Sequence, residues 1–336
     1  PYLLNQAAEV TSYGFQVLYR DRYGFTRTQW RVLANLGKFG AMTARDICVI
    51  SHIEKTKVSR AVAALEAWGM LSRTPSETDR RAEVLSLTPQ GREVFRQLVA
   101  NCDVVTLNNR PETLTKWGID FDDLVKVNPR LVMLHVSAYG RTGPYANRPG
   151  FARVAEAFAG LTHRTGFAGE EPAQSGYPML GDGVTGLYGA FAILLALRQR
   201  DRTQQPQLID LGLYETFLRL IEDQIPAYGE DRSVMSRIGN SNPLICPNGL
   251  FATRDGRYVS IPASTEALWR RLVRLMGDDS LLAYDSNPLR IRHRDLIEGK
   301  VAAWTQSHDF RDLLQICADA GIACGVEEAP EAGIAH

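Results

Sequence analysis

DVVTLNNRPETLTKWGIDFDDLVKVNPRLVMLHV, residues 103–136, is the stretch that decides the fold class of this chain. Its two ends, 103–107 and 131–136, are short runs rich in apolar and β-branched residues, which is typical of buried parallel strands. Between them lies a helical stretch that ends at Asn128-Pro129. Two such strands separated by a helix predict an α/β layer with a parallel sheet.

The character of the sequence changes just upstream of this stretch, near residue 100. Residues 1–100 contain 14 Lys and Arg against 9 Asp and Glu, and the chain totals of 38 and 38 leave 24 against 29 for residues 101–336. A net charge of zero therefore hides a basic and an acidic part. A basic N-terminal part indicates a polyanion as partner.

The basic part has the pattern of a helix-turn-helix. Residues 28–39 have helical apolar spacing, a short helix follows from an N-cap at Thr43, and a second runs from about Lys55 to Trp68. Two short helices joined by a tight turn are typical of this motif. Its second helix begins with short donors and cations that can reach phosphates and base edges; these are Lys55, Thr56, Lys57, Ser59 and Arg60.

A β-hairpin and a further helix are expected next. Residues 72–88, SRTPSETDRRAEVLSLT, hold two strand-like runs around a polar tip, and Thr88-Pro89 then supplies an N-cap and a first-turn proline. The motifs TRTQWRVL (26–33) and DRRAEVLSLTPQG (79–91) resemble the MarR type of winged-helix regulator. The resemblance implies double-stranded DNA as partner, with Lys57, Ser59 and Arg60 in the major groove and Arg81 of the wing at the minor groove. The neighbouring wing residue Arg80 is a further expected DNA contact. A small helical bundle with a solvated basic face is the alternative.

One carboxylate stands out downstream of the expected strands. In YPMLGDGVTGLYGAFAILLALRQRD (177–201), Asp182 lies between Gly181 and Gly183 at the mouth of an apolar helix. Taken alone, this pattern predicts a helix N-cap, because Asp is favoured there. The flanking glycines also leave room for a bulky ligand to approach the carboxylate.

The motifs around Asp182 point further. Four segments, in this order, resemble the class III CoA-transferases: 103–120, 128–161, 180–201 and 237–261. The resemblance covers about residues 101–330 of the chain. The resemblance implies acyl-CoA and a carboxylic acid as substrates, and ping-pong transfer with Asp182 as the catalytic carboxylate. It implies a CoA-binding segment (Asn108, Asn109, Arg110, Lys116), an active-site loop from Gly239 through Asn240 to Gly249, and a homodimer. The related racemases carry a His-Asp pair where this chain has Phe151-Ala152, so racemization is disfavoured.

Other classes are disfavoured by composition. Five scattered cysteines without CxxC spacing predict free thiols and a cytoplasmic protein, and the six histidines do not fall at ligand spacing, so no metal is expected. The apolar run 187–197 is too short to predict a membrane span.

The sequence therefore predicts a multidomain chain with a winged helix-turn-helix domain at 1–100 and a partial class III CoA-transferase-like α/β domain at 101–336. The resemblance implies that the winged helix stands where members of the family carry a leading nucleotide-binding segment. The expected function is CoA transfer between carboxylic acids, fused to a DNA-binding module. Two alternatives stay open: a transcriptional regulator that uses the α/β part as an acyl-CoA sensor, and a chain of joined fragments with incomplete activities.

Overall fold

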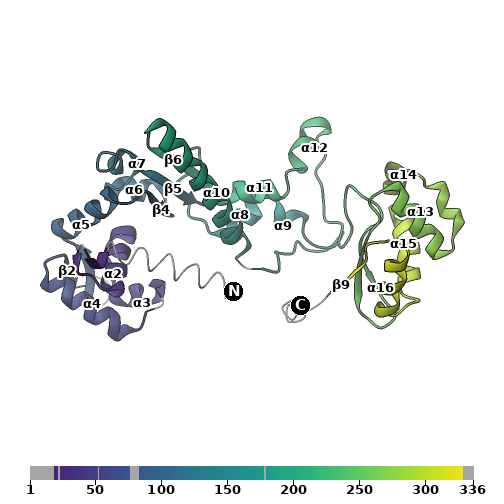
Figure 1. Cartoon of the computed structure of the whole chain (residues 1–336), viewed down its shortest axis with the longest axis horizontal. Helices are drawn as coiled ribbons and strands as arrows, with labels where there is room; N and C mark the ends of the chain where they lie inside the picture. Colours follow the sequence, from purple (N-terminus) through teal and green to yellow (C-terminus); the bar gives the residue numbers. More distant parts are fainter. Residues whose placement is uncertain (1–18, 22, 52, 76–82, 178, 328–336) are drawn as a thin grey trace. The chain divides into compact units, whose positions relative to one another are not determined.

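The chain is described by a computed structural model that covers residues 19–327, apart from 22, 52, 76–82 and 178. It divides into two compact units (Figure 1). The first unit runs to Ala159 and includes Tyr177–Leu220, and the second unit contains Gly160–Gly176 and the chain from Ile221 onward. Within the first unit, residues 19–100 are called the winged-helix part and the remainder the sheet part.

The winged-helix part contains the predicted helix-turn-helix, hairpin and following helix, and the structure adds a short strand, β1, to the hairpin in an antiparallel sheet of order β1-β3-β2. The helices are α2 (Arg27–Phe39), α3 (Ala44–Ser51), α4 (Lys55–Ala67) and α5 (Pro89–Ala100). The strands are β1 (Met42–Thr43), β2 (Leu71–Pro75) and β3 (Glu83–Leu87). The hairpin tip lies outside the described residues, and with it the predicted DNA contacts Arg80 and Arg81.

Local capping explains where these helices begin. At the start of α2, the Gln29 amide donates to Thr26 Oγ1 (3.3 Å) and the Thr26 amide donates to Gln29 Oε1 (2.7 Å), a capping box. At the start of α5, Thr88 Oγ1 accepts from the Gly91 amide at 3.1 Å, with Pro89 in the first turn. The predicted helices at 28–39 and after Thr88 are confirmed.

The sheet part contains three parallel strands in the order β4-β5-β6. These are β4 (Val104–Leu107), β5 (Val132–Ser137) and β6 (Gln207–Gly212). The surrounding helices are α6 (Pro111–Trp117), α7 (Phe121–Leu124), α8 (Ala152–Ala159), α10 (Leu180–Thr203) and α11 (Leu213–Leu220). Leu107 pairs with His135 and His135 with Asp210, so the carboxyl ends of the strands meet at one edge. The predicted parallel sheet is confirmed.

The long helix α10 packs along β5 and β6 (Figure 1). A side chain at Gly189 would bring a Cβ within 2.9 Å of Leu134 on β5, so glycine permits this close approach. By length and composition, α10 is the one helix in the described part of the chain that could cross a membrane, although a soluble helix can pass the same test. Its length exceeds the apolar run seen in the sequence because less apolar residues extend the helix at both ends.

Helix α5 belongs to the cores of both parts of the first unit. Val94 and Leu98 are buried in the winged-helix core, whereas Val99 packs with the residues around β4 and α6. The side-chain amide of Asn128 donates to the carbonyls of Val99 (3.1 Å) and Cys102 (2.7 Å). The winged-helix part is therefore attached to the sheet part by packing as well as by the chain, and the domain boundary at residue 100 stays a prediction.

The second unit is built on an antiparallel sheet of order β7-β8-β9. Its strands are β7 (Asn248–Ala252), β8 (Tyr258–Pro262) and β9 (Gly325–Val326). Its helices are α9 (Leu161–Arg164), α12 (Gln224–Asp231), α13 (Glu266–Met276), α14 (Asn287–Arg292), α15 (Arg294–Thr305) and α16 (Phe310–Asp319), with a 3-10 turn at Asp279–Ala283. Buried Trp269 lies in its core.

Candidate active site and nucleic-acid interface

Asp182 lies in the first turn of α10, and its side chain is exposed. The N-cap position is taken by Met179, whose carbonyl accepts the Gly183 amide at 2.9 Å. The sequence reading of Asp182 as the N-cap is therefore wrong, because the N-cap lies three residues earlier. Within the described part of the chain, no group forms a hydrogen bond or ion pair with this carboxylate, which leaves it available to react.

The glycines on either side of Asp182 have different surroundings. A Cβ at Gly181 would lie 2.7 Å from the ring of Phe217 and 3.1 Å from the Cβ of Ala152. A Cβ at Gly183 would meet no atom within 4 Å. Gly181 thus allows α10 to pack closely on α8 and α11, whereas Gly183 leaves open space beside the carboxylate.

Asp182 lines a cavity of about 240 Å³, here called the Asp182 cavity. It lies where β4 and β6 end, which is where parallel sheets of open α/β proteins usually bind ligands. Asn108 follows β4 and Leu213 follows β6, and both line it. The remaining walls come from the strands and from the next turn of α10: Thr106, Leu107, Leu134, Val136, Thr185 and Gly186.

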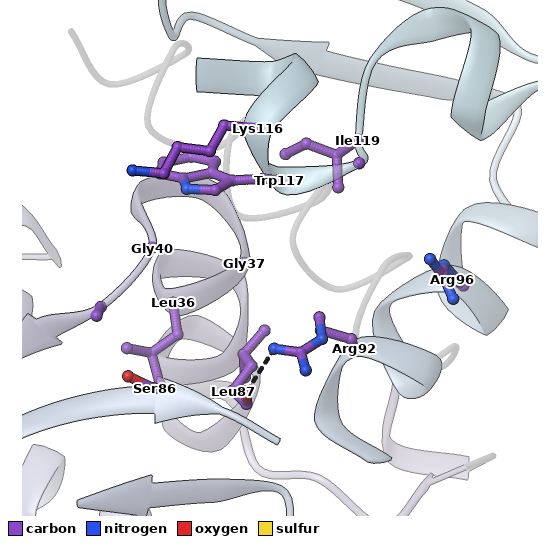
Figure 2. Close-up of a pocket in the computed structure, with 12 residues that line it drawn as sticks. Leu36, Gly37, Gly40, Ser86, Leu87, Arg92, Arg96, Lys116, Trp117 and Ile119 are labelled. Atoms are coloured by element: carbon purple, nitrogen blue, oxygen red, sulfur yellow. Dashed lines mark hydrogen bonds between the residues drawn. The ribbon is translucent and has the colours of Figure 1, made fainter. Parts of the chain in front are cut away.

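The predicted CoA-binding residues are placed in different surroundings. Asn108 shares the cavity with Asp182. The backbone carbonyl of Asn109 accepts a hydrogen bond from Nε2 of His135 at 2.6 Å. Arg110 donates to the Asn147 carbonyl (3.2 Å) and pairs with Glu112 (2.9 Å). Lys116 instead lines a separate cavity beside the winged-helix part (Figure 2).

His135 is a polar residue that sequence reasoning passed over. It lies within the apolar run of β5 and is fully buried, and its Nδ1 lies 3.9 Å from Oδ1 of Asp210. The amide of Arg141 also donates to Asp210, at 2.9 Å. A histidine inside an otherwise apolar strand was the available signal. The contacts of His135 fix the turn after β4, which carries Asn108.

The loop after β5 forms an aromatic cluster. The ring of Phe158 on α8 meets Tyr139, Tyr145 and Tyr214 edge-on, at centroid distances of 5.1, 5.4 and 5.4 Å. Such edge-to-face pairs stabilise an arrangement beyond the area that they bury. The segment between β5 and α8 is therefore held against α8 and the start of α11.

The position that carries a base in the related racemases lies close to the Asp182 backbone. Ala152 opens α8 and is buried beside Gly181, while Phe151 is exposed. Neither side chain can abstract a proton. The chain therefore lacks a base at these two positions.

The predicted active-site loop belongs to the second unit, a different unit from Asp182. Gly239 has a left-handed φ of 64°, and its amide donates to the Gly166 carbonyl at 2.9 Å. The Asn240 carbonyl accepts from the Leu250 amide at 3.3 Å, and Ser241 forms a bridge with Gly249. These contacts tie both ends of the loop to each other.

The predicted DNA-reading residues share one side of α4. Its core side is formed by Val58, Ala61, Val62 and Leu65. The exposed side carries Lys55, Thr56, Lys57, Ser59 and Arg60. Lys57 pairs with Glu54 at 3.2 Å, and both side chains are well exposed, so the pair is weak. Among the described residues, no group of three or more His, Cys, Asp or Glu side chains could hold a metal ion.

In a comparison with known protein families, two family models match different parts of this chain. Residues 61–336 match the family model described as CoA-transferase family III, and residues 23–82 match the MarR family model. The two ranges overlap at the end of α4 and in the hairpin. The transferase match covers most of the chain and includes Asp182 and Asn108.

Named relatives agree with the larger match. The beta subunit of succinyl-CoA–L-malate CoA-transferase from Chloroflexus aurantiacus is 39% identical over 288 residues, which is 84% of this chain and 70% of the relative. The succinyl-CoA:mesaconate CoA-transferase of Haloarcula marismortui is 31% identical, over 75% of this chain and 64% of the relative.

Solved structures show the same likeness. A CAIB/BAIF family protein from Brucella suis superposes with a TM-score of 0.62 at 30% identity, over 74% of this chain and 66% of its own. This chain thus spans about two thirds of the length of the relatives that it matches.

Proposed function

Because the chain belongs to CoA-transferase family III, we propose that it moves coenzyme A from an acyl-CoA to a free carboxylic acid, with Asp182 as the nucleophile. The observation that carries the proposal is the position of Asp182: a carboxylate without a partner among the described residues, in a cavity at the carboxyl ends of parallel strands. A carboxylate suits this reaction because its acyl adduct is reactive enough for a thiolate to displace it.

The reaction has two symmetric halves. The Asp182 carboxylate attacks the thioester carbonyl and expels CoA thiolate, which gives a mixed anhydride. The thiolate then attacks the aspartyl carbonyl, which releases the donor acid and forms an aspartyl-CoA thioester. An acceptor carboxylate then attacks the aspartyl carbonyl of this thioester and expels the thiolate, which gives a second mixed anhydride. The thiolate attacks the acceptor's carbonyl in that anhydride, which forms the new acyl-CoA and releases the Asp182 carboxylate. No external acid, base or oxidant is consumed.

The first turn of α10 supplies electrostatic help. The first amides of a helix have no intrahelical carbonyl partner, and the helix dipole places partial positive charge there. Asp182 stands in this turn, so developing negative charge on an attacked carbonyl oxygen is favoured nearby.

The Asp182 cavity fits the thioester end of an acyl-CoA. Its apolar walls, Leu107, Leu134 and Val136, suit an acyl or pantetheine chain, and its volume of about 240 Å³ suits a small acid. The cation nearest to Asn108 in the sequence is Arg110, two residues further on, and its guanidinium forms an ion pair with Glu112. We assign Asn108 to the pantetheine chain. For substrates, the named relatives favour succinyl-CoA as donor and a dicarboxylic acid such as malate or mesaconate as acceptor.

The test is the initial rate of transfer from succinyl-CoA to malate and to mesaconate by the full chain. Asp182→Asn keeps the size of the side chain and removes the nucleophile, so we expect a loss of at least about 10³-fold. Asp122→Asn, an exposed acid on α7, is the matched control and retains the rate. Full activity in Asp182→Asn would refute the role of Asp182.

A second activity is supported by the winged-helix part. The exposed cations of α4 and the MarR match favour binding of double-stranded DNA by this helix. Because one winged helix reads only half of a two-fold site, tight binding requires two copies. In a fluorescence-anisotropy titration with DNA, Arg60→Ala is expected to weaken binding and lower the salt dependence by about one phosphate contact, whereas Arg202→Ala, on the exposed end of α10, is expected to change neither. Equal effects of both variants would argue against α4 as the reading helix.

We also propose that two copies associate through α10. Leu187, Phe191 and Leu194 are 75%, 63% and 66% exposed and recur at helical spacing, which gives α10 an uncovered apolar face. In a symmetric dimer, α10 of one copy would pack against α10 of the other and bury this face on both.

A further inference from the structure

A second cavity, of about 360 Å³, lies within the first unit between its winged-helix part and its sheet part (Figure 2). It is called the Trp117 cavity. One wall is the end of α6 with Lys116 and Trp117, and another is α5 with Arg92 and Arg96. The apolar side chains Leu36 and Leu87 complete its lining on the winged-helix side.

Three cations line this cavity: Lys116, Arg92 and Arg96. Among the described residues, no carboxylate lies within ion-pair distance of Lys116, Arg92 or Arg96. Arg92 donates one bond to the Leu87 carbonyl at 2.8 Å, which orients its guanidinium and leaves other N–H groups available. Three cations on two walls, with apolar surface between them, give the cavity a positive character that favours an anionic ligand.

From this arrangement we propose that the Trp117 cavity binds a small dicarboxylic acid. One carboxylate pairs with Lys116 and the other with Arg92 or Arg96, whose planar guanidinium matches a carboxylate. The hydrocarbon body lies against Leu36, Leu87 and the indole of Trp117. The volume is within the range of small-molecule pockets. The proposal is independent of the transfer activity.

The location gives such a ligand a consequence for the winged-helix part. Trp117 packs on Gly40 at the end of α2, and α2 packs on α4, the predicted reading helix. A dicarboxylate that joins α6 to α5 would fix the sheet part against α5, which itself packs on α2.

The experiment is calorimetric titration of the full chain with unbranched dicarboxylates from succinate to suberate, each compared with its monomethyl ester. We expect saturable binding of at least one acid at one site per chain, and a loss of at least tenfold for its monoester. Lys116→Met and Arg92→Met should each lower the affinity at least tenfold. Lys126→Met, an exposed lysine on the loop after α7, should leave it unchanged.

Asp182→Asn separates this site from the Asp182 cavity, since it is expected to retain the binding. The proposal is overturned if no acid of the series binds, if the monoesters bind equally well, or if binding survives in the Lys116→Met/Arg92→Met double variant. Loss of binding in Asp182→Asn alone would place the acid in the Asp182 cavity and also overturn it. Thermal melting of each variant confirms that the fold is intact, since Lys116 and Arg92 are both exposed.

Discussion

The indole of Trp117 lies directly against Gly40: a Cβ at Gly40 would be only 2.8 Å from Cζ2 of Trp117. This is the point where α6 of the sheet part meets the end of α2 (Figure 2). Gly40 has φ 76° and ψ −156°, a backbone conformation open essentially to glycine alone. The contact between the two parts of the first unit therefore depends on a residue without a side chain.

Gly40→Ala is expected to lower the free energy of unfolding by about 1–3 kcal/mol, because it adds both backbone strain and a clash with Trp117. Urea denaturation checks this. If the clash contributes, Gly40→Ala in a Trp117→Ala background costs less than in the native chain, and a double-mutant cycle measures the difference. Additive effects would show that the indole and Gly40 do not interact.

The two glycines that flank Asp182 offer a matched pair. Gly181→Ala is expected to destabilise the first unit by about 1–3 kcal/mol, because its Cβ would overlap the ring of Phe217. Gly183→Ala meets no atom within 4 Å and is expected to keep or slightly raise stability, since alanine favours a helix. It should nevertheless lower the transfer rate by crowding the space beside Asp182. Thermal melts and initial rates of both variants decide this, and a fully active Gly183→Ala would contradict the assignment of that space to substrate.

A partly buried ion pair gives a pH dependence. Burial alone would raise the pKa of Asp120, but hydrogen bonds from the Phe121 amide (2.7 Å) and the Arg141 guanidinium (2.6 Å) outweigh it and hold the pKa below its usual value. A lowered folded-state pKa stabilises the fold above the unfolded-state pKa of about 4, and this stabilisation is lost as the pH falls through the folded-state value.

Arg141→Met should therefore cost about 1–3 kcal/mol at pH 7 and progressively less below about pH 4. Urea midpoints measured from pH 3 to 7 test this. Lys126→Met is the control, because Lys126 pairs with Asp123 at 3.4 Å on the surface and such pairs contribute little. A cost for Arg141→Met that does not change with pH would rule out Asp120 as its partner.

The apolar face of α10 predicts concentration-dependent association. Phe191→Asp places a charge at its centre and is expected to shift the chain toward the monomer, which sedimentation velocity measures. Tyr258→Asp, an exposed apolar position on β8 of the second unit, serves as control. A monomeric native chain would contradict the proposed association through α10.

Local signals in the sequence predicted most elements of the first unit. The helix at 28–39 begins at a capping box, and the strands at 103–107 and 131–136 are continuous apolar runs. These signals come from residues close together in the sequence, so they can be recognised without knowledge of the tertiary structure. The N-cap of α10 was placed three residues too late, because the pattern Gly-Asp-Gly resembles a cap and Met179 does not.

Long-range contacts could not be predicted in this way. Lys116 lies only eight residues beyond Asn108, but the two residues line different cavities. Asn108 lines the Asp182 cavity, whereas Lys116, near the end of α6, lines the Trp117 cavity. The contact of Trp117 with Gly40 joins residues 77 positions apart, and its only local signal is a glycine after α2. Likewise, the assignment of 239–249 to a separate unit follows from tertiary packing alone.

The most direct test of the central claim is intact-protein mass spectrometry after the full chain is incubated with succinyl-CoA. The account predicts a covalent adduct of coenzyme A on the native chain, which maps to the peptide containing Asp182 and is absent from Asp182→Asn. An adduct that persists in Asp182→Asn, or a native chain that forms none, would contradict the claim that Asp182 is the nucleophile.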